Sequence, residues 1–272
     1  MGERLSVIAG SGALVPEVLE AAQRQGFEIQ LLTLGRRRDL QGLTAIPFSL
    51  ADPGGAIDAI RTFGATRFVM AGGVSISDLA RERLRSFFSG KASTIGDTGL
   101  SRLTDDLAAL TGARPLGVHQ IAPELLAGAG HIAGPEPTAA QRDAAAYGLD
   151  LARRAGALDL GQAVVVAGRR AIAAEDIGGT DALLARVRRL RTRGHTADGG
   201  SPLVLAKAAK PDQPLYIDLP AIGPVTIARA RRAGVGAIVL QAGAALLIGR
   251  RELTAAAARA RISVFGMVPS DA

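Results

Sequence analysis

The densest set of residues that could do chemistry lies between positions 207 and 226, in the sequence KAAKPDQPLYIDLPAIGPVT. Lys207 and Lys210 are two of only three lysines among 32 basic residues, and an ammonium is a compact charge suited to a phosphate oxygen. Asp218 follows a short apolar stretch and stands close before Pro220. A carboxylate beside two ammonium groups indicates Mg²⁺ binding or activation of a water molecule. A surface salt bridge between Asp218 and a lysine explains the spacing equally well.

Two glycine turns follow predicted strands and could meet a phosphate through their backbone N–H groups. Gly10-Ser11-Gly12 comes after the apolar run Leu5–Ala9, and Gly72-Gly73 comes after Phe68–Ala71. If both runs are parallel strands, their carboxyl ends meet at one edge of the sheet, where ligands bind in such folds. The two turns therefore predict a ligand site at that edge, with plain tight turns as the alternative.

The first glycine turn lacks two parts of the dinucleotide-binding fingerprint. Val15 occupies the position of the third glycine, and no acidic residue follows the second predicted strand, where Arg36-Arg37-Arg38 lies instead. The sequence therefore argues against an NAD site and leaves an NADP site conceivable.

Two further segments place polar residues at the start of predicted helices. Asp97 suits an N-cap and a ligand contact equally well. Thr180 is a natural cap for the helix that follows it, and Asp181 complements the dipole of that helix. Residue chemistry alone favours capping over ligand binding for Thr180 and Asp181.

Several catalytic machineries lack the residues that they need. The chain has no Cys, which excludes disulfides, a thiolate nucleophile and a zinc–thiolate site. No spacing makes two of the histidines His119, His131 and His195 a metal pair. The sequence has neither a G-x-S-x-G elbow nor a G-x-x-x-x-G-K-[ST] loop, so a serine triad and a P-loop nucleotidase find no support.

The net charge of +7 comes almost wholly from clusters of arginine. Such clusters suit solvated helix faces, a phosphate-bearing substrate or an anionic membrane surface. With no Trp and two Tyr, no aromatic residues interleave with the clusters, so no nucleic-acid partner is expected. No apolar stretch reaches the roughly 20 residues that span a bilayer, and no signal-peptide pattern is present, so we expect a cytoplasmic protein. The clusters are Arg36–Arg38, Arg81–Arg85, Arg186–Arg193, Arg229–Arg232 and Arg250-Arg251.

Apolar runs alternate with amphipathic stretches, which is typical of an α/β fold with a parallel sheet. We predict an N-terminal nucleotide-binding-like domain over residues 1–130 and a C-terminal α/β domain with a mixed sheet over residues 131–272. The Gly- and Pro-rich stretch 128–137 is the expected linker and interdomain hinge. After it, Thr138 and Gln141 form a capping box that starts a helix.

The remaining elements follow from periodicity and turn signals. The expected strands are Leu5–Ala9, Ile29–Thr33, Phe68–Ala71, Leu116–Val118, Ala163–Ala167, Ala171–Ala174, Leu203–Ala206, Ala237–Leu240, Ala245–Ile248 and Ile262–Phe265. The expected helices are Pro16–Gln25, Asp52–Phe63, Asp78–Phe88, Asp97–Leu110, Thr138–Ala155, Asp181–Leu190, Thr226–Ala233 and Glu252–Ala260.

Six segments occur in an order that adds to these residue patterns. They are Ile8–Gly12, Gly96-Asp97, Asp159–Val165, Gly179-Thr180-Asp181, Lys207-x-x-Lys210-Pro211-x-Gln213 and Asp218-Leu219-Pro220-x-x-Gly223-x-x-Thr226. This ordered set resembles the LpxI-type UDP-2,3-diacylglucosamine pyrophosphatases of lipid A biosynthesis. The match runs over essentially the whole chain, and the segment from Lys207 to Thr226 is its most specific part.

The resemblance implies Mg²⁺-dependent hydrolysis of UDP-2,3-diacylglucosamine to UMP and 2,3-diacylglucosamine 1-phosphate (lipid X), with water attacking the phosphorus on the sugar side. It also implies a Rossmann-like N-terminal domain, a C-terminal domain of the family's own type, and substrate between them. Asp218 matches the family's invariant aspartate and is expected to bind the metal or to activate water. Lys207, Lys210 and Gln213 match the motif that would hold the diphosphate. The substrate-binding residues that we expect are Gly10, Ser11, Gly12, Gly72, Gly73, Asp97, Thr180, Asp181, Lys207, Lys210, Gln213 and Thr226.

The chain departs from the family pattern at two positions. The family often has Glu where this chain has Gly178, and an acidic residue where it has Pro214. Glu175 or Asp181 is the expected substitute in the metal site. The alternative function is a non-catalytic protein that binds a nucleotide sugar or NADP. The arginine clusters suggest transient contact with the anionic inner-membrane surface, and the sequence leaves the oligomeric state open, a homodimer included.

Overall fold

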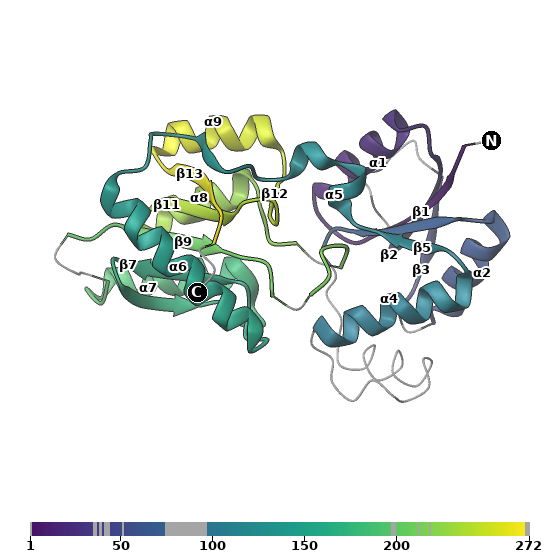
Figure 1. Cartoon of the computed structure of the whole chain (residues 1–272), viewed down its shortest axis with the longest axis horizontal. Coiled ribbons are helices and arrows are strands. Elements are labelled where there is room, and N and C mark those ends of the chain that lie inside the picture. Colours follow the sequence, from purple (N-terminus) through teal and green to yellow (C-terminus); the bar gives the residue numbers. More distant parts are fainter. Residues whose placement is uncertain are drawn as a thin grey trace. The chain divides into compact units, whose positions relative to one another are not determined.

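The chain forms two α/β units, each with its own central sheet (Figure 1). The computed structural model describes residues 2–34, 37, 40, 44–50, 52–73, 97–196, 200–211, 213–217 and 219–269, with the backbone alone for 97–100 and 102. The first unit comprises residues 1–124 and 213–217, and the second comprises residues 125–212 and 218–272. The chain therefore leaves the second unit and returns to it inside the segment that the family match singles out.

The sheet of the first unit is parallel throughout, with the strand order β3-β2-β1-β4-β5. In the central strand, Val7 is fully buried and lies opposite Leu31 of β2 and Val69 of β4. The strand order reverses between β1 and β4, which is where ligands bind in such sheets. The strands are β1 (Arg4–Ala9), β2 (Glu28–Leu34), β3 (Ala45–Phe48), β4 (Arg67–Ala71) and β5 (Arg114–Leu116).

Helices cover both faces of this sheet (Figure 1). Ile60 of α2 and Leu107 of α4 pack with Leu32 and Phe68 of the strands in one apolar core. α1 lies on the other face together with α5, and its apolar side chains are spaced for a single buried stripe. The helices are α1 (Leu14–Arg24), α2 (Gly54–Phe63), α4 (Asp97–Thr111) and α5 (Val118–Ile121), followed by the 3₁₀ turn η2 (Pro123–Leu125).

The second unit is built on a mixed sheet with the order β6-β13-β11-β9-β7-β8. Its three parallel strands β9, β11 and β13 are flanked by antiparallel strands on both sides. A short parallel pair, β10 with β12, forms a separate ladder. The strands are β6 (Gly130–Ala133), β7 (Ala163–Ala167), β8 (Arg170–Ala174), β9 (Leu203–Lys207), β10 (Ala221–Ile222), β11 (Val235–Gln241), β12 (Leu246–Leu247) and β13 (Ser263–Met267).

Both faces of the mixed sheet are buried, which explains its continuous aliphatic runs. Along β7, Val165 points into the core formed with α7, α8 and α9, whereas Val164 and Val166 point into the core formed with α6. Gly148 allows α6 to lie close to the sheet, because a Cβ there would stand 2.9 Å from the Cβ of Ala206. The helices are α6 (Ala139–Ala157), α7 (Gly179–Thr192), α8 (Pro224–Ala233) and α9 (Arg250–Ala260).

The parallel and mixed sheets predicted from the sequence are confirmed, and so is the capping box of α6. Thr138 Oγ1 accepts the Gln141 backbone N–H at 3.2 Å, and Gln141 Oε1 accepts the Thr138 N–H at 2.9 Å. The helix expected over 78–88 lies outside the described residues. None of the described helices combines the length and apolar character that crossing a membrane requires.

The linker predicted over 128–137 is wrong, because β6 within it pairs antiparallel with β13. The glycines that suggested a loop instead allow two backbones to approach. A Cβ at Gly134 would lie 1.9 Å from the carbonyl oxygen of Ile262, the residue before β13. β3 was not predicted, since Pro47 interrupts its apolar pattern, and proline is tolerated there because β3 is an edge strand.

Candidate functional site

The two glycine turns of the first unit bond to each other at the carboxyl ends of β1 and β4. The Ser11 N–H donates to the Gly73 carbonyl at 2.7 Å, and the Gly73 N–H donates to the Ser11 carbonyl at 2.8 Å. Ser11 Oγ also donates to the Gly73 carbonyl, at 3.0 Å. We call residues 10–12 with 72–73 the glycine clasp. The N–H and carbonyl groups of Ser11 and Gly73 bond to each other across the clasp. Contact of the clasp with a substrate stays a prediction.

Two glycines of the clasp, Gly10 and Gly72, are required because a Cβ at either position would clash with the facing turn. A Cβ at Gly10 would stand 2.4 Å from the carbonyl oxygen of Gly73, and one at Gly72 would stand 2.4 Å from that of Ser11. Gly72 also has φ +89°, which disfavours any residue with a Cβ. Arg37 donates to the carbonyls of Gly10 and Gly12, so a guanidinium charge lies at this turn.

In the second unit, a chain of polar groups gathers where β9 ends. Lys207 Nζ donates to Thr180 Oγ1 at 2.9 Å, and Thr180 Oγ1 donates to Glu175 Oε1 at 2.6 Å. The second oxygen of Glu175 accepts the Gln162 N–H at 2.9 Å, and Lys207 Nζ also donates to the Ala221 carbonyl at 3.0 Å. We call these five residues, Gln162, Glu175, Thr180, Lys207 and Ala221, the lysine network. It joins the hairpin, the start of α7 and β10 through one cation.

Local structure fixes each member of the lysine network. Lys207 is the last residue of β9 and is only 4% exposed, so its ammonium relies on protein partners for hydrogen bonds. Glu175 follows the β7–β8 hairpin, and its N–H donates to the Ala163 carbonyl at 2.8 Å. Gly161 leaves room for it, since a Cβ there would lie 2.8 Å from the Glu175 carbonyl oxygen.

Lys210 lies just beyond the network and forms an ion pair with Asp159. The distance from Lys210 Nζ to Asp159 Oδ1 is 2.5 Å, and the side chains are 13% and 47% exposed. Asp159 adopts φ +56°, a conformation that is uncommon outside glycine. The chain before Lys210 is tied to the sheet, because the Ala209 N–H donates to Gln241 Oε1 at 3.1 Å. The expected motif residues 159–163 and 207–210 therefore come together.

Capping by Thr180, which residue chemistry favoured, is wrong. α7 begins two residues earlier than that interpretation requires, with Gly178 at the N-cap and no side-chain cap bond. Asp176 Oδ1 instead accepts the Gly178 N–H at 2.8 Å. The Asp181 carboxylate forms an ion pair with Arg229 of α8.

Two other expected site residues, Thr226 and Gln213, have contacts apart from the lysine network. Thr226 Oγ1 accepts the Gly223 N–H at 3.3 Å at the start of α8. Gln213 belongs to the first unit, and its Nε2 is a buried atom to which no described residue offers a hydrogen bond. Among the described residues, the buried His119 Nδ1 of the same unit has no partner either. The sequence offered no signal for the return of residues 213–217 to the first unit.

Asp218 and the side chain of Asp97 lie outside the described residues, so their expected roles stay predictions. The backbone directly after Asp218 is nevertheless fixed. The Pro220 carbonyl accepts a hydrogen bond from the Leu246 N–H at 2.8 Å, and the Ala221 carbonyl accepts one from Lys207 Nζ. Leu219 and Pro220 are buried.

In the described part of the chain, which leaves Asp218 out, no three His, Asp or Glu side chains come together as a metal site would need. Both carboxylates that were expected to substitute in the metal site have partners. Glu175 accepts hydrogen bonds at both oxygens, and Asp181 is paired with Arg229. Sequence reasoning missed Asp159 as the partner of Lys210, and an acid–base pair with positions so far apart in the chain gave no signal.

The fold and the site together define a two-unit α/β protein. One unit has a Rossmann-like parallel sheet, and the other has a mixed sheet whose strand β9 ends in a buried lysine. Family models match both units: the LpxI N-terminal domain matches residues 4–125, and the LpxI C-terminal domain matches residues 128–265. The chain belongs to the LpxI family of enzymes. It is similar to the UDP-2,3-diacylglucosamine pyrophosphatase LpxI of Caulobacter vibrioides, with 32% identity covering 98% of this chain and 99% of that protein.

Two solved structures show weaker likeness. A short-chain dehydrogenase/reductase superfamily protein from Agrobacterium tumefaciens is 25% identical over 40% of this chain and 30% of its own, with a TM-score of 0.27. UDP-glucose 4-epimerase from Thermus thermophilus is 17% identical over 98% of this chain and 86% of its own, with a TM-score of 0.32. At these TM-scores neither likeness bears on the fold or the function.

Proposed function

We propose that the protein hydrolyses the diphosphate of UDP-2,3-diacylglucosamine to UMP and 2,3-diacylglucosamine 1-phosphate, a step of lipid A biosynthesis. The substrate comes from the name of the Caulobacter vibrioides relative. The structural observation that carries the proposal is the 3.0 Å bond from Lys207 Nζ to the Ala221 carbonyl. This bond holds a buried cation against the backbone that follows Asp218. Hydrolysis of a phosphate bond requires the catalytic carboxylate to be positioned, and a fixed backbone beside Asp218 supports that positioning.

The two lysines of the motif take different parts in this proposal. Lys207 is a positioning residue through its bonds to Thr180 and Ala221, in addition to the diphosphate contact that the family motif predicts. Lys210 is oriented by Asp159 and supplies charge to the diphosphate. Gln213 Nε2 is a buried donor that has no partner among the described residues, and the family motif predicts that a phosphate oxygen satisfies it.

The proposed reaction is an in-line displacement at phosphorus. Water attacks the phosphorus on the sugar side, and the Asp218 carboxylate accepts its proton. The bond from that phosphorus to the bridging oxygen breaks, and UMP leaves with the bridging oxygen. Fixed ammonium groups stabilise the charge that develops on the phosphoryl oxygens, which is the largest contribution that a protein makes to such a step.

Magnesium is the proposed cofactor. Mg²⁺ is commonly held by one or two carboxylates and by the substrate's phosphates, so Asp218 with the diphosphate suffices without a cluster of acids. When bound, the ion would neutralise charge on the phosphoryl oxygens. The contacts of Glu175 and Asp181 with Thr180 and Arg229 leave Asp218 as the carboxylate that we assign to the metal.

The test is incubation with UDP-2,3-diacylglucosamine in H₂¹⁸O, with and without Mg²⁺. We expect UMP release that depends on Mg²⁺, with the label in the 1-phosphate of the lipid product and none in UMP. Label in UMP would contradict attack on the sugar side. Tight binding of the nucleotide sugar or of NADP without any UMP release would replace the proposal by the alternative, a non-catalytic binding protein.

Asp218→Ala tests the assigned carboxylate. We expect UMP release to fall by about 10³-fold, as for loss of an electrostatic stabiliser, with substrate binding retained. Asp150→Ala is the matched control, since Asp150 forms an ion pair within α6 with Arg154. Full Mg²⁺-dependent turnover by Asp218→Ala would sink the assignment.

We also propose that the enzyme works in the cytoplasm and contacts the anionic surface of the inner membrane transiently, because its substrate carries two acyl chains. Fractionation of cells into soluble and membrane pools, at low and high salt, tests this. A protein found solely in the soluble pool at low salt would contradict the membrane contact.

A further inference from the structure

The helices α7 and α8 of the second unit carry a concentration of positive charge that the proposed chemistry does not use. Within these two helices Asp181 is the sole acidic residue. The exposed or half-buried arginines of α7, its C-cap and α8 form what we call the arginine face. They are Arg186, Arg188, Arg189, Arg191, Arg193, Arg229, Arg231 and Arg232.

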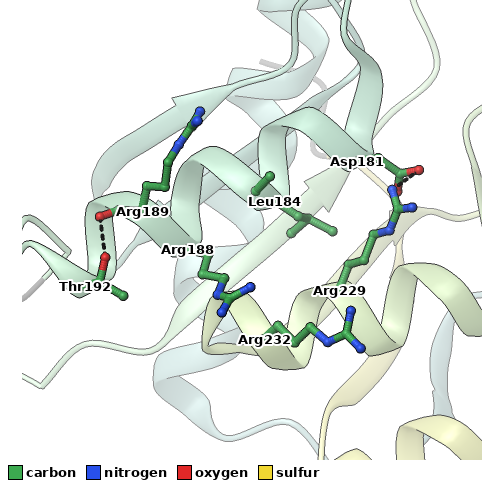
Figure 2. Close-up of a pocket in the computed structure, with 8 residues that line it drawn as sticks. Asp181, Leu184, Arg188, Arg189, Thr192, Arg229 and Arg232 are labelled. Carbon is green, nitrogen blue, oxygen red and sulfur yellow. Dashed lines mark hydrogen bonds and ion pairs between the residues drawn. The ribbon is translucent and has the colours of Figure 1, made fainter.

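A groove of about 530 Å³ runs between the two helices and is lined by four of these arginines. Figure 2 shows Arg188 of α7 and Arg229 and Arg232 of α8 at this groove, with Arg229 turned to Asp181. Cations that line one groove repel each other, and an anion in the groove relieves that repulsion. The geometry therefore favours a ligand that presents negative charge to the groove.

Few carboxylates balance the arginine face. Arg229 pairs with Asp181, and Arg186 pairs with Asp176. The other six arginines form no ion pair with a carboxylate among the described residues, and all six are exposed. On α6, which covers the opposite face of the sheet, Arg154 pairs with Asp150 and Arg142 pairs with Glu136. Arg153 of α6 pairs with no described carboxylate, against six such arginines on the arginine face, so most of the surplus charge of these helices lies on the arginine face.

Exposed apolar side chains stand at the amino ends of the same two helices. Ile177, just before α7, is 94% exposed, and Val225 in the first turn of α8 is 60% exposed. Thr180 of the lysine network lies at the same end of α7. Apolar side chains beside basic ones suit the headgroup boundary of a bilayer, where aliphatic groups enter and guanidinium groups bind phosphate.

Neither helix carries an aromatic residue, which disfavours single-stranded nucleic acid as the partner because its bases need stacking surfaces. We propose that the arginine face docks the protein on a bilayer of anionic phospholipid, with the amino ends of α7 and α8 at the lipid boundary. This inference rests on the proposed function, since a lipid-linked substrate gives the docking its purpose. The phosphodiester headgroup is the recognised chemistry.

Vesicle sedimentation of the full chain tests the docking without any turnover. Vesicles of phosphatidylcholine alone are compared with vesicles that also contain phosphatidylglycerol. We expect binding to the second kind only. The variant Arg188→Gln/Arg189→Gln/Arg232→Gln loses three charges worth about 1 kcal/mol each near an anionic surface, so its partitioning should weaken by roughly 100-fold.

The matched control is Arg142→Gln/Arg153→Gln/Arg154→Gln, which removes the same charge from α6. It should bind the anionic vesicles within about threefold of the unchanged protein, since α6 does not face the bilayer in this arrangement. Equal weakening by both triple variants, or by neither, would overturn the proposal. So would tighter binding of duplex or single-stranded nucleic acid than of anionic vesicles at physiological salt.

Turnover of detergent-dispersed substrate separates this inference from the proposed function. The arginine-face variant should release UMP from dispersed substrate at the unchanged rate, and from substrate in anionic vesicles at least about tenfold more slowly. Vesicle binding without UMP release would defeat the proposed function and leave the docking surface standing. UMP release with equal rates on vesicles for both triple variants would defeat the docking surface alone.

Discussion

The two sheets end in edges of opposite construction. At the edge of the first unit, the glycine clasp joins two turns mainly through backbone groups. The turns can approach because Gly10 and Gly72 have no Cβ. At the edge of the second unit, the lysine network joins three segments through side chains around a buried ammonium. A backbone edge of this kind specifies shape, whereas a side-chain edge also places charge. The chemistry of the protein is therefore expected to depend on the second edge more than on the first.

This comparison changes the meaning of the glycine motifs. In the sequence, Gly10-Ser11-Gly12 suggested a phosphate site, because glycine allows backbone N–H groups to reach a phosphate. In the structure, the N–H groups of Ser11 and Gly73 are already donated to carbonyls within the clasp. Substitutions at the clasp should consequently act on stability, and substitutions in the lysine network should act on turnover.

The largest effect in this comparison is expected from Lys207→Met. The change removes a buried ammonium and leaves two half-buried groups, the Ala221 carbonyl and the Thr180 hydroxyl, without the donor that they accept from. We expect UMP release to fall by about 100-fold or more, and the free energy of unfolding to fall by about 1–3 kcal/mol. Steady-state kinetics and urea unfolding followed by circular dichroism measure the two effects.

Lys210→Met is the control for Lys207→Met, because it removes an ammonium of the same motif that is partly exposed and paired outside the network. It should spare the free energy of unfolding to within about 1 kcal/mol. Equal loss of stability in both variants would show that burial of Lys207 has no special weight, and the contrast between the two edges would be lost.

The next effect belongs to the clasp. Gly10→Ala places a Cβ 2.4 Å from the carbonyl oxygen of Gly73, so the two turns must separate. We expect a loss of roughly 1–3 kcal/mol in the free energy of unfolding of the first unit, with smaller change in kcat than Lys207→Met. Gly55→Ala in α2 is the control, since no heavy atom lies within 4 Å of its Cβ position. A clasp that tolerated Gly10→Ala without loss of stability would not be the steric contact described above.

Thr180→Val gives a smaller and more specific effect. Valine keeps the shape of threonine but removes the hydroxyl that accepts from Lys207 and donates to Glu175. We expect about 1 kcal/mol less stability and a fall in kcat with KM little changed, because the variant disturbs positioning. Thr254→Val on α9, where the hydroxyl bonds the Arg250 carbonyl, controls for the same change at an exposed place. A rise in KM alone would instead place the Thr180 hydroxyl against the substrate.

Much of the fold was readable because burial decides it. The run Ala163–Ala167 predicts a strand, since five aliphatic residues cover both of its faces. β6 was misread because its partner strand β13 lies far away in the sequence, and it is the close approach of Ile262 before that strand that requires Gly134. The family motif brought Thr180 and Lys207 to attention, but their mutual bond depends on how the hairpin and α7 meet. The periodicity of the sequence does not predict how the hairpin packs against α7. It does not predict that Gln213 belongs to the first unit either.

The smallest effect, and the finest test of the second edge, comes from Asp159. Its side chain is 47% exposed, so Asp159→Asn should cost less than about 1 kcal/mol of stability, and we expect the same of Asp150→Asn in the α6 pair. If Lys210 holds the diphosphate, Lys210→Gln raises KM by about tenfold, since a charge-assisted bond is lost. Asp159→Asn then changes KM much less, because the ammonium remains and only its orientation relaxes. A KM that rises equally in both variants would make the ion pair itself the functional unit, and Lys210 would join Lys207 as a residue that acts through its partners.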